Sequence, residues 1–467
     1  MYAERRVATA DMAQVREAAL LTSEPLGAYA STDRLHYLFL GPGGVLDLSA
    51  ARPAAGETIP ALAGTHPMFD WDEREMCAAQ GVAIAGLPDT RPLFIDGGNA
   101  PAALAAEGPG VTVAVVGPVH AGIIEPGRFT FSTGGETVIH LDAQLSYSRR
   151  GVEAFLEGGV AVEQAARVAR ICAACSAARS WAYARALEHL GGVRCDERSE
   201  LARVVVAELE RIYNHLFDLA SAASGAGFGY GLTHGLGLKE RAHELCWSAT
   251  QHRLLFDAIV PGGVREGVLL DAPALRAGAA WLRDDARAYL RGLFANISLV
   301  RRFEGAGVVS PEIARTFGAV GPARRASGGA FDVRYTLPYG AYQDLQPVVE
   351  TETEGDVAAR VRVKARELEG AFELVDRALA MLGEHAPPPP QRVEAAAGTI
   401  TMLTEGARGT ESVSLECDAQ GIVKRLHVRS ASFRNWPTVL RAMEGNIVPD
   451  FPLVNKSFNL CYACVDR

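Results

Sequence analysis

The 467-residue sequence lacks several features that mark other classes of protein. No run of eighteen or more apolar residues is present, so no membrane-spanning segment is expected. The opening MYAERRVATADMAQ lacks the apolar centre of a secretion signal. There is no lysine-rich block, and 46 basic against 55 acidic residues give a net charge of −9, which argues against nucleic acid as a partner. We expect a cytoplasmic globular protein whose core the 48% apolar residues can fill.

Proline and glycine clusters divide the chain near Gly108. The stretch LPDTRPLFIDGGNAPAALAAEGPG indicates a linker, so residues 1–108 are expected to form a short, turn-rich α/β domain. Residues 109–467 would form the second domain. That domain opens with the β-branched run VTVAVVGPVH and with RFTFSTGGETVIHL, which alternates around Gly134 and Gly135 as a hairpin does.

Long helical patterns dominate the second domain. Residues 162–189 contain no glycine or proline and predict one helix with a glycine stop, and further helices are predicted over 197–224, 238–260, 272–300 and 355–382. A polyproline connector at 385–391 leads to short strands at 398–403, 411–417 and 423–430 and a helix at 435–446. The predicted class is α+β, mainly a helical bundle with small β elements.

Two cysteine pairs share the spacing Cys-x-x-Cys, Cys172 with Cys175 and Cys461 with Cys464. On a helix, positions i and i+3 lie on one face, so the first pair can direct both sulfurs to one point. Four thiolates suit a soft or borderline metal, tetrahedral zinc being the simplest, but 285 residues between the pairs is far beyond a zinc motif. A coincidental, buried role for each pair is the alternative. Packing is expected for the isolated cysteines, Cys77, Cys195, Cys246 and Cys417.

RICAACSAARSWAYARALE and DFPLVNKSFNLCYACVDR resemble the two metal-binding signatures of the nickel-iron hydrogenase large subunit. The resemblance is strongest to the energy-converting, complex I-related branch that includes the formate hydrogenlyase large subunit. GPVHAGIIEPGRFTF, ELERIYNHLFDLASAASGAGF, EGARGTE and NWPTVLRAMEGNIVPDFPL extend it in family order over residues 111–467. Through FDWDEREMCAAQGVAIAGLPDTRPLF, residues 1–108 resemble a truncated 30-kDa-type subunit of complex I fused to the 49-kDa type.

The resemblance implies a nickel-iron centre for reversible oxidation of dihydrogen. Cys172 and Cys461 would be terminal nickel ligands, and Cys175 and Cys464 would bridge nickel to an iron that carries carbonyl and cyanide. It also implies that Glu125 relays protons. Arg408 would place a guanidinium over the open metal position. These roles suit the chemistry, because splitting dihydrogen needs a Lewis acid and a nearby base, a tuned carboxylate can carry the proton outward, and arginine keeps its charge.

The resemblance also implies partners. They are an iron-sulfur small subunit of the complex I 20-kDa type, a ferredoxin-like iron-sulfur subunit, antiporter-like membrane subunits and metal-centre maturation proteins. No iron-sulfur cluster motif is evident in this chain. The chain is expected on the cytoplasmic side of the inner membrane as a peripheral subunit. In this family a tail beyond the last cysteine pair is often removed, and Arg467 stands at that cleavage position.

Several positions depart from the family pattern. Ala173 and Ala174 lie between the first two cysteines, and Arg179 replaces a histidine that normally hydrogen-bonds near a bridging thiolate. Arg128 and Arg149 also stand where histidines are common, and arginine does not titrate in the working range.

These departures support an alternative, a metal-poor coupling subunit with a structural role or with a quinone-facing pocket near His120. Glu208, Arg211 and His215 share one helical face and predict an internal salt-bridge network. Retention of all four cysteines favours the metal centre.

Overall fold

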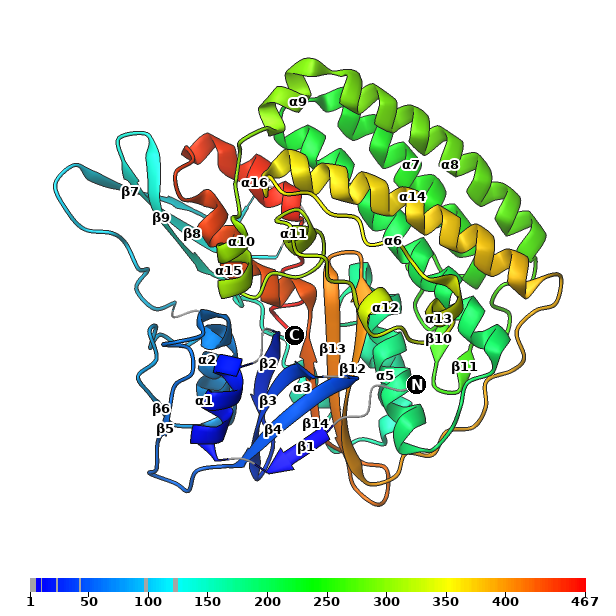
Figure 1. Cartoon of the computed structure of the whole chain (residues 1–467), viewed down its shortest axis with the longest axis horizontal. Helices are drawn as coiled ribbons and strands as arrows, with labels where there is room; N and C mark the ends of the chain where they lie inside the picture. Colours follow the sequence, from blue (N-terminus) through cyan, green and yellow to red (C-terminus); the bar gives the residue numbers. More distant parts are fainter. Residues whose placement is uncertain (1–5, 10, 22–23, 42, 96–99, 121–124) are drawn as a thin grey trace.

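The computed structural model describes residues 6–9, 11–21, 24–41, 43–95, 100–120 and 125–467. A small α/β unit and a large helical bundle lie on either side of a three-stranded sheet (Figure 1). Helices and strands both contribute, with helices in the majority. The predicted α+β class is therefore confirmed.

The first unit is a four-stranded sheet in the order β1-β4-β3-β2. β1 runs parallel to β4 and the other neighbours are antiparallel. Leu35, Tyr37 and Phe39 of β3 share a core with α1 and α2, whereas Leu38 on the opposite face joins the main core of the protein. Both faces of the sheet are therefore covered, which explains its nearly continuous apolar pattern. Its elements are β1 (Arg6–Thr9), α1 (Met12–Leu21), β2 (Pro25–Ala30), β3 (Arg34–Gly41), β4 (Gly44–Ala51) and α2 (Asp70–Gln80).

A buried carboxylate in α2 makes the stability of the protein depend on pH. Glu73 accepts hydrogen bonds from the backbone amides of Leu62 (2.8 Å) and Ala63 (3.0 Å), yet burial raises its pKa from 4.5 to about 7. Because the folded protein binds the proton of this carboxyl more tightly than the unfolded chain does, protonation favours the folded state. The resulting stabilisation is complete below pH 4.5 and is lost as the pH rises towards 7. The loss is about 3 kcal/mol.

Glu73→Gln is expected to reduce the pH dependence of stability by about 3 kcal/mol, because glutamine does not titrate. Urea unfolding at about pH 5 and about pH 8 would measure the change in free energy of unfolding for both proteins. The exposed Glu57→Gln is the control and should keep the wild-type dependence. An unchanged dependence in Glu73→Gln would show that another group causes it.

The chain continues with an antiparallel sheet of β7 (Val111–Val116), β8 (Arg128–Gly134) and β9 (Thr137–Gln144). β8 and β9 pack against the main core and α15 (Ala431–Met443), whereas β7 lies on the outer side and is largely exposed (Figure 1). Gly135 in the β8–β9 turn has a φ of +64°, a conformation that glycine adopts without strain. The predicted hairpin is confirmed.

The bundle consists of α6 (Glu197–Gly225), α7 (Gly229–Thr250), α8 (Ala272–Ala295) and α14 (Val357–Leu382). α6 is buried along nearly its whole length because α7, α14 and α16 pack around it. The helices predicted over 197–224 and 355–382 match α6 and α14. The helix predicted over 272–300 is wrong at its end, since Asn296 caps a new helix by accepting from the Leu299 amide (3.1 Å). Among the described residues no helix is long and apolar enough to cross a membrane.

The C-terminal sheet, β12 (Gly398–Gly406), β13 (Gly409–Cys417) and β14 (Val423–Arg429), is antiparallel throughout and confirms the three predicted strands. α5 (Ser176–Leu190) packs against β12 and β13. On the opposite side, Arg429 of β14 forms an ion pair with Glu75 of α2 (2.9 Å), and Arg467 pairs with the same carboxylate (2.8 Å). These buried charges join the first unit to the C-terminal sheet and the C-terminal segment.

Shorter elements connect these layers. They are β5 (Ile59–Pro60), β6 (Ile84–Ala85), α3 (Val152–Leu156), α4 (Ala165–Ala169), β10 (Ile259–Val260), β11 (Gly263–Val264), α9 (Ile297–Phe303), α10 (Pro311–Thr316), α11 (Gly321–Arg325), α12 (Val333–Thr336), α13 (Tyr342–Leu345), α15 (Ala431–Met443) and α16 (Phe451–Phe458), with 3-10 turns at Pro67–Phe69, Ala161–Gln164, Ala173–Cys175 and Val448–Asp450.

The single helix predicted over 162–189 is wrong. The chain leaves the helical conformation after Arg170, and Cys172 is extended with φ −155° and ψ 127°. A 3-10 turn then leads into α5 at Ser176. Cys172 and Cys175 therefore lie in a turn and not on one helical face.

Candidate metal centre

Four cysteine sulfurs converge between α5, α6 and the C-terminal segment. Cys172 and Cys175 lie in the turn before α5, and Cys461 and Cys464 follow α16. Their Sγ atoms all lie within 4.8 Å of one another. Cys461 is half-buried and the other three are buried. Two distant segments thus surround one point with four soft ligands.

Helix α6 holds the turn of the first cysteine pair. The Glu210 carboxylate accepts hydrogen bonds from two backbone amides in the first turn of α5 (2.6 and 3.1 Å), groups that have no partner within a helix. Tyr213 Oη donates to the Ala173 carbonyl (3.0 Å). Asn214 Nδ2 donates to the Ala174 carbonyl (2.8 Å). Burial raises the pKa of Glu210 to about 7.

Arg150 connects the two cysteine turns directly. Its Nη2 donates to the Ile171 carbonyl (2.7 Å) before the first pair and to the Ala463 carbonyl (2.8 Å) within the second. One guanidinium therefore helps to set the distance between the turns. The Cys461 amide donates to Ser432 Oγ (2.9 Å), which anchors the second turn on α15.

Asp218 of α6 is the carboxylate that pairs with two buried cations near the second cysteine pair. Its Oδ2 accepts from Lys364 Nζ (2.7 Å), and its Oδ1 accepts from Asn459 Nδ2 (2.5 Å) and Arg408 Nη2 (3.2 Å). Burial raises the pKa of Asp218, but Lys364 and Arg408 outweigh this effect and hold it below the ordinary value. The carboxylate therefore stays charged and fixes the segment leading to Cys461.

Arg408 lies in the tight turn between β12 and β13 and is 5% exposed. Its Nη1 donates to Asn214 Oδ1 (2.7 Å), and its Nε donates to the Asn459 carbonyl. Burial lowers its pKa, but the charges of Cys461 and Asp218 outweigh burial and raise it. The structure thus holds a permanent cation in electrostatic range of the sulfurs.

Glu125 is half-buried, and its charge acts on Tyr462 and Asp466 in the segment of the second cysteine pair. A Cβ at Gly127 would lie 2.6 Å from Tyr462 Cε1, so this segment approaches Tyr462 more closely than another residue would allow. Burial, with a contribution from the Glu125 charge, raises the pKa of Asp466 to about 7. Residues 121–124 of the matched stretch lie outside the described residues.

The structure also places three further residues named in the sequence analysis, His120, Arg149 and Arg128. His120 Nε2 lies 2.6 Å from the Gly127 carbonyl, which satisfies that nitrogen. The Arg149 guanidinium stacks 4.0 Å from the centre of the Phe94 ring. Arg128 begins β8, and its buried Nε has no hydrogen-bond partner in the part of the chain that the structure describes.

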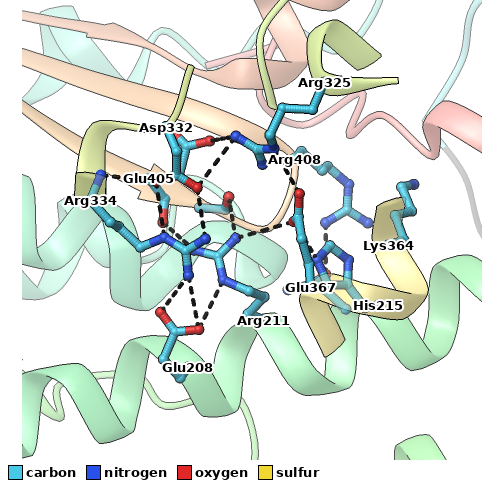
Figure 2. Close-up of polar contacts among 12 residues, drawn as sticks. Glu208, Arg211, His215, Arg325, Asp332, Arg334, Lys364, Glu367, Glu405 and Arg408 are labelled. Atoms are coloured by element: carbon cyan, nitrogen blue, oxygen red, sulfur yellow. Dashed lines mark hydrogen bonds and ion pairs between the residues drawn. The ribbon is translucent and has the colours of Figure 1, made fainter. Parts of the chain in front are cut away.

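Behind Arg408 lies a buried network of alternating charges, which Figure 2 shows along α6. Glu208 accepts from Arg211 Nε (3.0 Å) and Arg334 Nη1 (2.9 Å), and Glu367 accepts from His215 Nε2 (3.0 Å). The predicted salt-bridge network is confirmed. Arg211 also donates to two carbonyls at the end of β12 (2.7 and 2.9 Å), so the network fixes the turn that carries Arg408.

Comparison with known proteins decides the family. Residues 231–467 match the family described as "Respiratory-chain NADH dehydrogenase, 49 Kd subunit". Formate hydrogenlyase subunit 5 of Escherichia coli (strain K12) is 30% identical over 445 residues, which cover 87% of this chain and 77% of the relative. The chain belongs to the 49-kDa subunit family of complex I.

Other relatives refine the position of this 49-kDa-type subunit. Membrane-bound hydrogenase subunit alpha of Pyrococcus furiosus is 28% identical over 378 residues, covering 75% of this chain and 86% of the relative. A chain of the membrane-bound sulfane sulfur reductase, an archaeal respiratory membrane complex, matches with a TM-score of 0.71 and 25% identity over 76% of this chain and 98% of that chain. The resemblance to large subunits of energy-converting, complex I-related hydrogenases is confirmed.

The donor set of this 49-kDa-type subunit fits a thiolate-bound metal group. Four sulfurs are gathered at one point, and two buried guanidiniums, Arg179 and Arg408, offset their negative charge. Two further donors of Arg179, Nε and Nη1, are buried without an acceptor among the described residues. Such donors suit a group that brings additional acceptors.

Sequence reasoning missed the residues that support the cysteines. Glu210, Asn214 and Asp218 recur every four residues on α6 and form a polar stripe on one helical face, a signal that could have been read. Arg150 and Glu411 carry no such signal, because their partners are remote in sequence.

Proposed function

We propose that this chain is the catalytic large subunit of a nickel-iron hydrogenase, which oxidises dihydrogen reversibly and passes electrons to an iron-sulfur subunit. The convergence of four sulfurs within 4.8 Å carries the proposal. Cys172, Cys175, Cys461 and Cys464 would hold a nickel-iron group whose iron carries carbonyl and cyanide. When bound, this group supplies the Lewis acid that polarises dihydrogen.

The chain supplies the base, the proton carrier and a fixed charge. Cys461 is the half-buried member of the four, so its thiolate is the ligand best placed to accept a proton and release it outward. Glu125 lies on the segment packed against the neighbouring Tyr462 and would take that proton next. Arg408 keeps a positive charge beside the reacting position at any working pH.

Glu125→Gln is expected to lower hydrogen turnover by about 100-fold or more, because the amide cannot carry a proton. Nickel content should stay at the wild-type level, since all four cysteines remain. Hydrogen uptake and metal analysis on the same preparation measure both quantities. Glu136→Gln, in the exposed β8–β9 turn, is the control, and equal activities would remove Glu125 from the proton path.

The partners follow from the same proposal. The chain would bind an iron-sulfur small subunit of the 20-kDa type, a ferredoxin-like iron-sulfur subunit and antiporter-like membrane subunits, after maturation proteins have supplied the metals. It would be peripheral, on the cytoplasmic side of the inner membrane. Residues 1–108 would be the truncated 30-kDa-type domain and residues 109–467 the 49-kDa-type domain.

A second candidate is a metal-poor coupling subunit that faces a quinone-like ligand. It is supported by the NADH dehydrogenase family match and by the replacement of the signature histidine with Arg179. Four gathered cysteines are not needed for that role, which leaves the hydrogenase the better supported candidate.

Metal analysis of the purified complex tests the proposal. Nickel and iron would be measured per chain, together with an infrared spectrum for bound carbonyl and cyanide. The hydrogenase requires about one nickel per chain and the diatomic bands. Neither signal, in material made with the maturation proteins present, would favour the quinone-facing candidate.

A further inference from the structure

Arg179 lies on α5, one turn after Cys175, and is wholly buried. Its Nη2 donates to Cys464 Sγ (3.4 Å) and to Glu411 Oε2 (2.8 Å). The other oxygen of Glu411 accepts from the Ala431 amide at the start of α15 (3.0 Å). The guanidinium is therefore held between a thiolate and a carboxylate that is itself anchored on the backbone.

We propose that Arg179 and Glu411 form a positioning pair that fixes the Cys464 thiolate and partly neutralises its charge in the metal-bound centre. This inference rests on the proposed nickel-iron centre. By the resemblance described above, Arg179 stands at a position where a histidine is expected. Because arginine cannot lose its proton in the working range, this chain keeps a constant charge where an imidazole would titrate.

The hydrogen bonding of Arg179 is incomplete at the atoms that lie beside the gathered sulfurs, unlike that of another buried arginine. Arg360, equally buried, donates from Nε, Nη1 and Nη2 to Ser457, Gly355 and Gly307 (2.7 to 2.9 Å). Arg179 has acceptors for Nη2 only, among the described residues. A buried donor without a partner is costly, and because Arg179 also donates to the Cys464 sulfur, its free donors are expected to serve a group bound at the sulfurs.

Arg179 and Glu411 would control the electron density on the bound metals. A cation that hydrogen-bonds a metal-bound sulfur would withdraw electron density from it, so the sulfur would donate less to the metal group. Removing the cation should increase donation to the carbonyl and cyanide ligands and move their infrared bands to lower wavenumber. A merely structural ion pair would not move these bands.

The test compares infrared spectra and metal content of the assembled complex. Arg179→Gln is expected to shift the carbonyl and cyanide bands to lower wavenumber by more than their width, and Arg179→Lys, which keeps the charge, should remain close to the wild type. Arg185→Gln on the same helix is the control, because Arg185 donates to the Leu403 carbonyl (2.7 Å), and its bands should not move.

Each result decides the inference. Unshifted bands in a metal-loaded Arg179→Gln would overturn it and leave the hydrogenase proposal intact. If Arg179→Gln takes up no metal, Glu411→Gln decides instead, because it releases Arg179 without removing it: a band shift supports the pair, and an unchanged spectrum overturns it. A wild-type complex without nickel or bands would overturn the proposed function and the pair together.

Discussion

Replacement of Cys461 by serine is expected to abolish nickel loading and hydrogen turnover together. A serine hydroxyl is a poor ligand for nickel beside three thiolates, because soft metals prefer sulfur donors. The half-buried position of Cys461 lets the smaller atom be accommodated, so the chain should still fold. Metal analysis, infrared bands and hydrogen uptake on one preparation would measure the effect.

Cys77→Ser is the matched control for this prediction. Cys77 is also half-buried but lies on α2 in the first unit, away from the four gathered sulfurs. Its variant should retain wild-type nickel content and activity. An unchanged metal content and an intact complex in Cys461→Ser would count against the centre and support the structural alternative.

Asp218→Asn is expected to lower the free energy of unfolding by about 3–5 kcal/mol, because it leaves buried cations without their counter-charge. Asp218 accepts from Lys364 and Arg408, and all three side chains are almost fully buried. Urea unfolding near neutral pH measures the loss. Asp376→Asn is the control, since Asp376 pairs with Arg276 at the surface (2.6 Å) with both side chains nearly half exposed, and exposed pairs contribute little.

The same variant has a defined pH dependence. Folding lowers the pKa of Asp218 below its ordinary 3.8, so its stabilising effect is present above that pH and is lost as the pH falls through the lower, folded-state value. The difference between wild type and Asp218→Asn should therefore shrink in acid. A difference that stays constant would assign the loss to hydrogen bonding alone.

Periodicity predicted the elements whose apolar faces are regular. α14 is a long helix with one apolar face, α6 is a long proline-free helix, and β12 to β14 alternate along the sequence, so local pattern and tertiary structure agree. The segment before Ser176 was wrongly predicted as a helix because local pattern and tertiary contacts disagree there. Its alanines favour a helix, but the carbonyls of Ile171, Ala173 and Ala174 accept from remote side chains, and these contacts override local propensity.

From the sequence, the four cysteines of the candidate site could be predicted, but the residues that support them could not. Spacing and resemblance identified the two cysteine pairs, whereas the supporting charges come from elements scattered along the chain. The replacement of histidine by Arg179 looked like a loss of function in the sequence. The structure supplies its partner Glu411, 232 positions away, which no local pattern could have indicated.

The 285 residues between the cysteine pairs also bear on the order of folding. Closing a flexible loop of that length costs about 5 kcal/mol of chain entropy, and contacts so distant in sequence form slowly. α6 and its sequence neighbour α7 pack against each other, so this pair should form earlier. A metal bound by all four thiolates would stabilise the completed fold strongly, because it closes so long a loop, while contributing nothing to the early steps of folding.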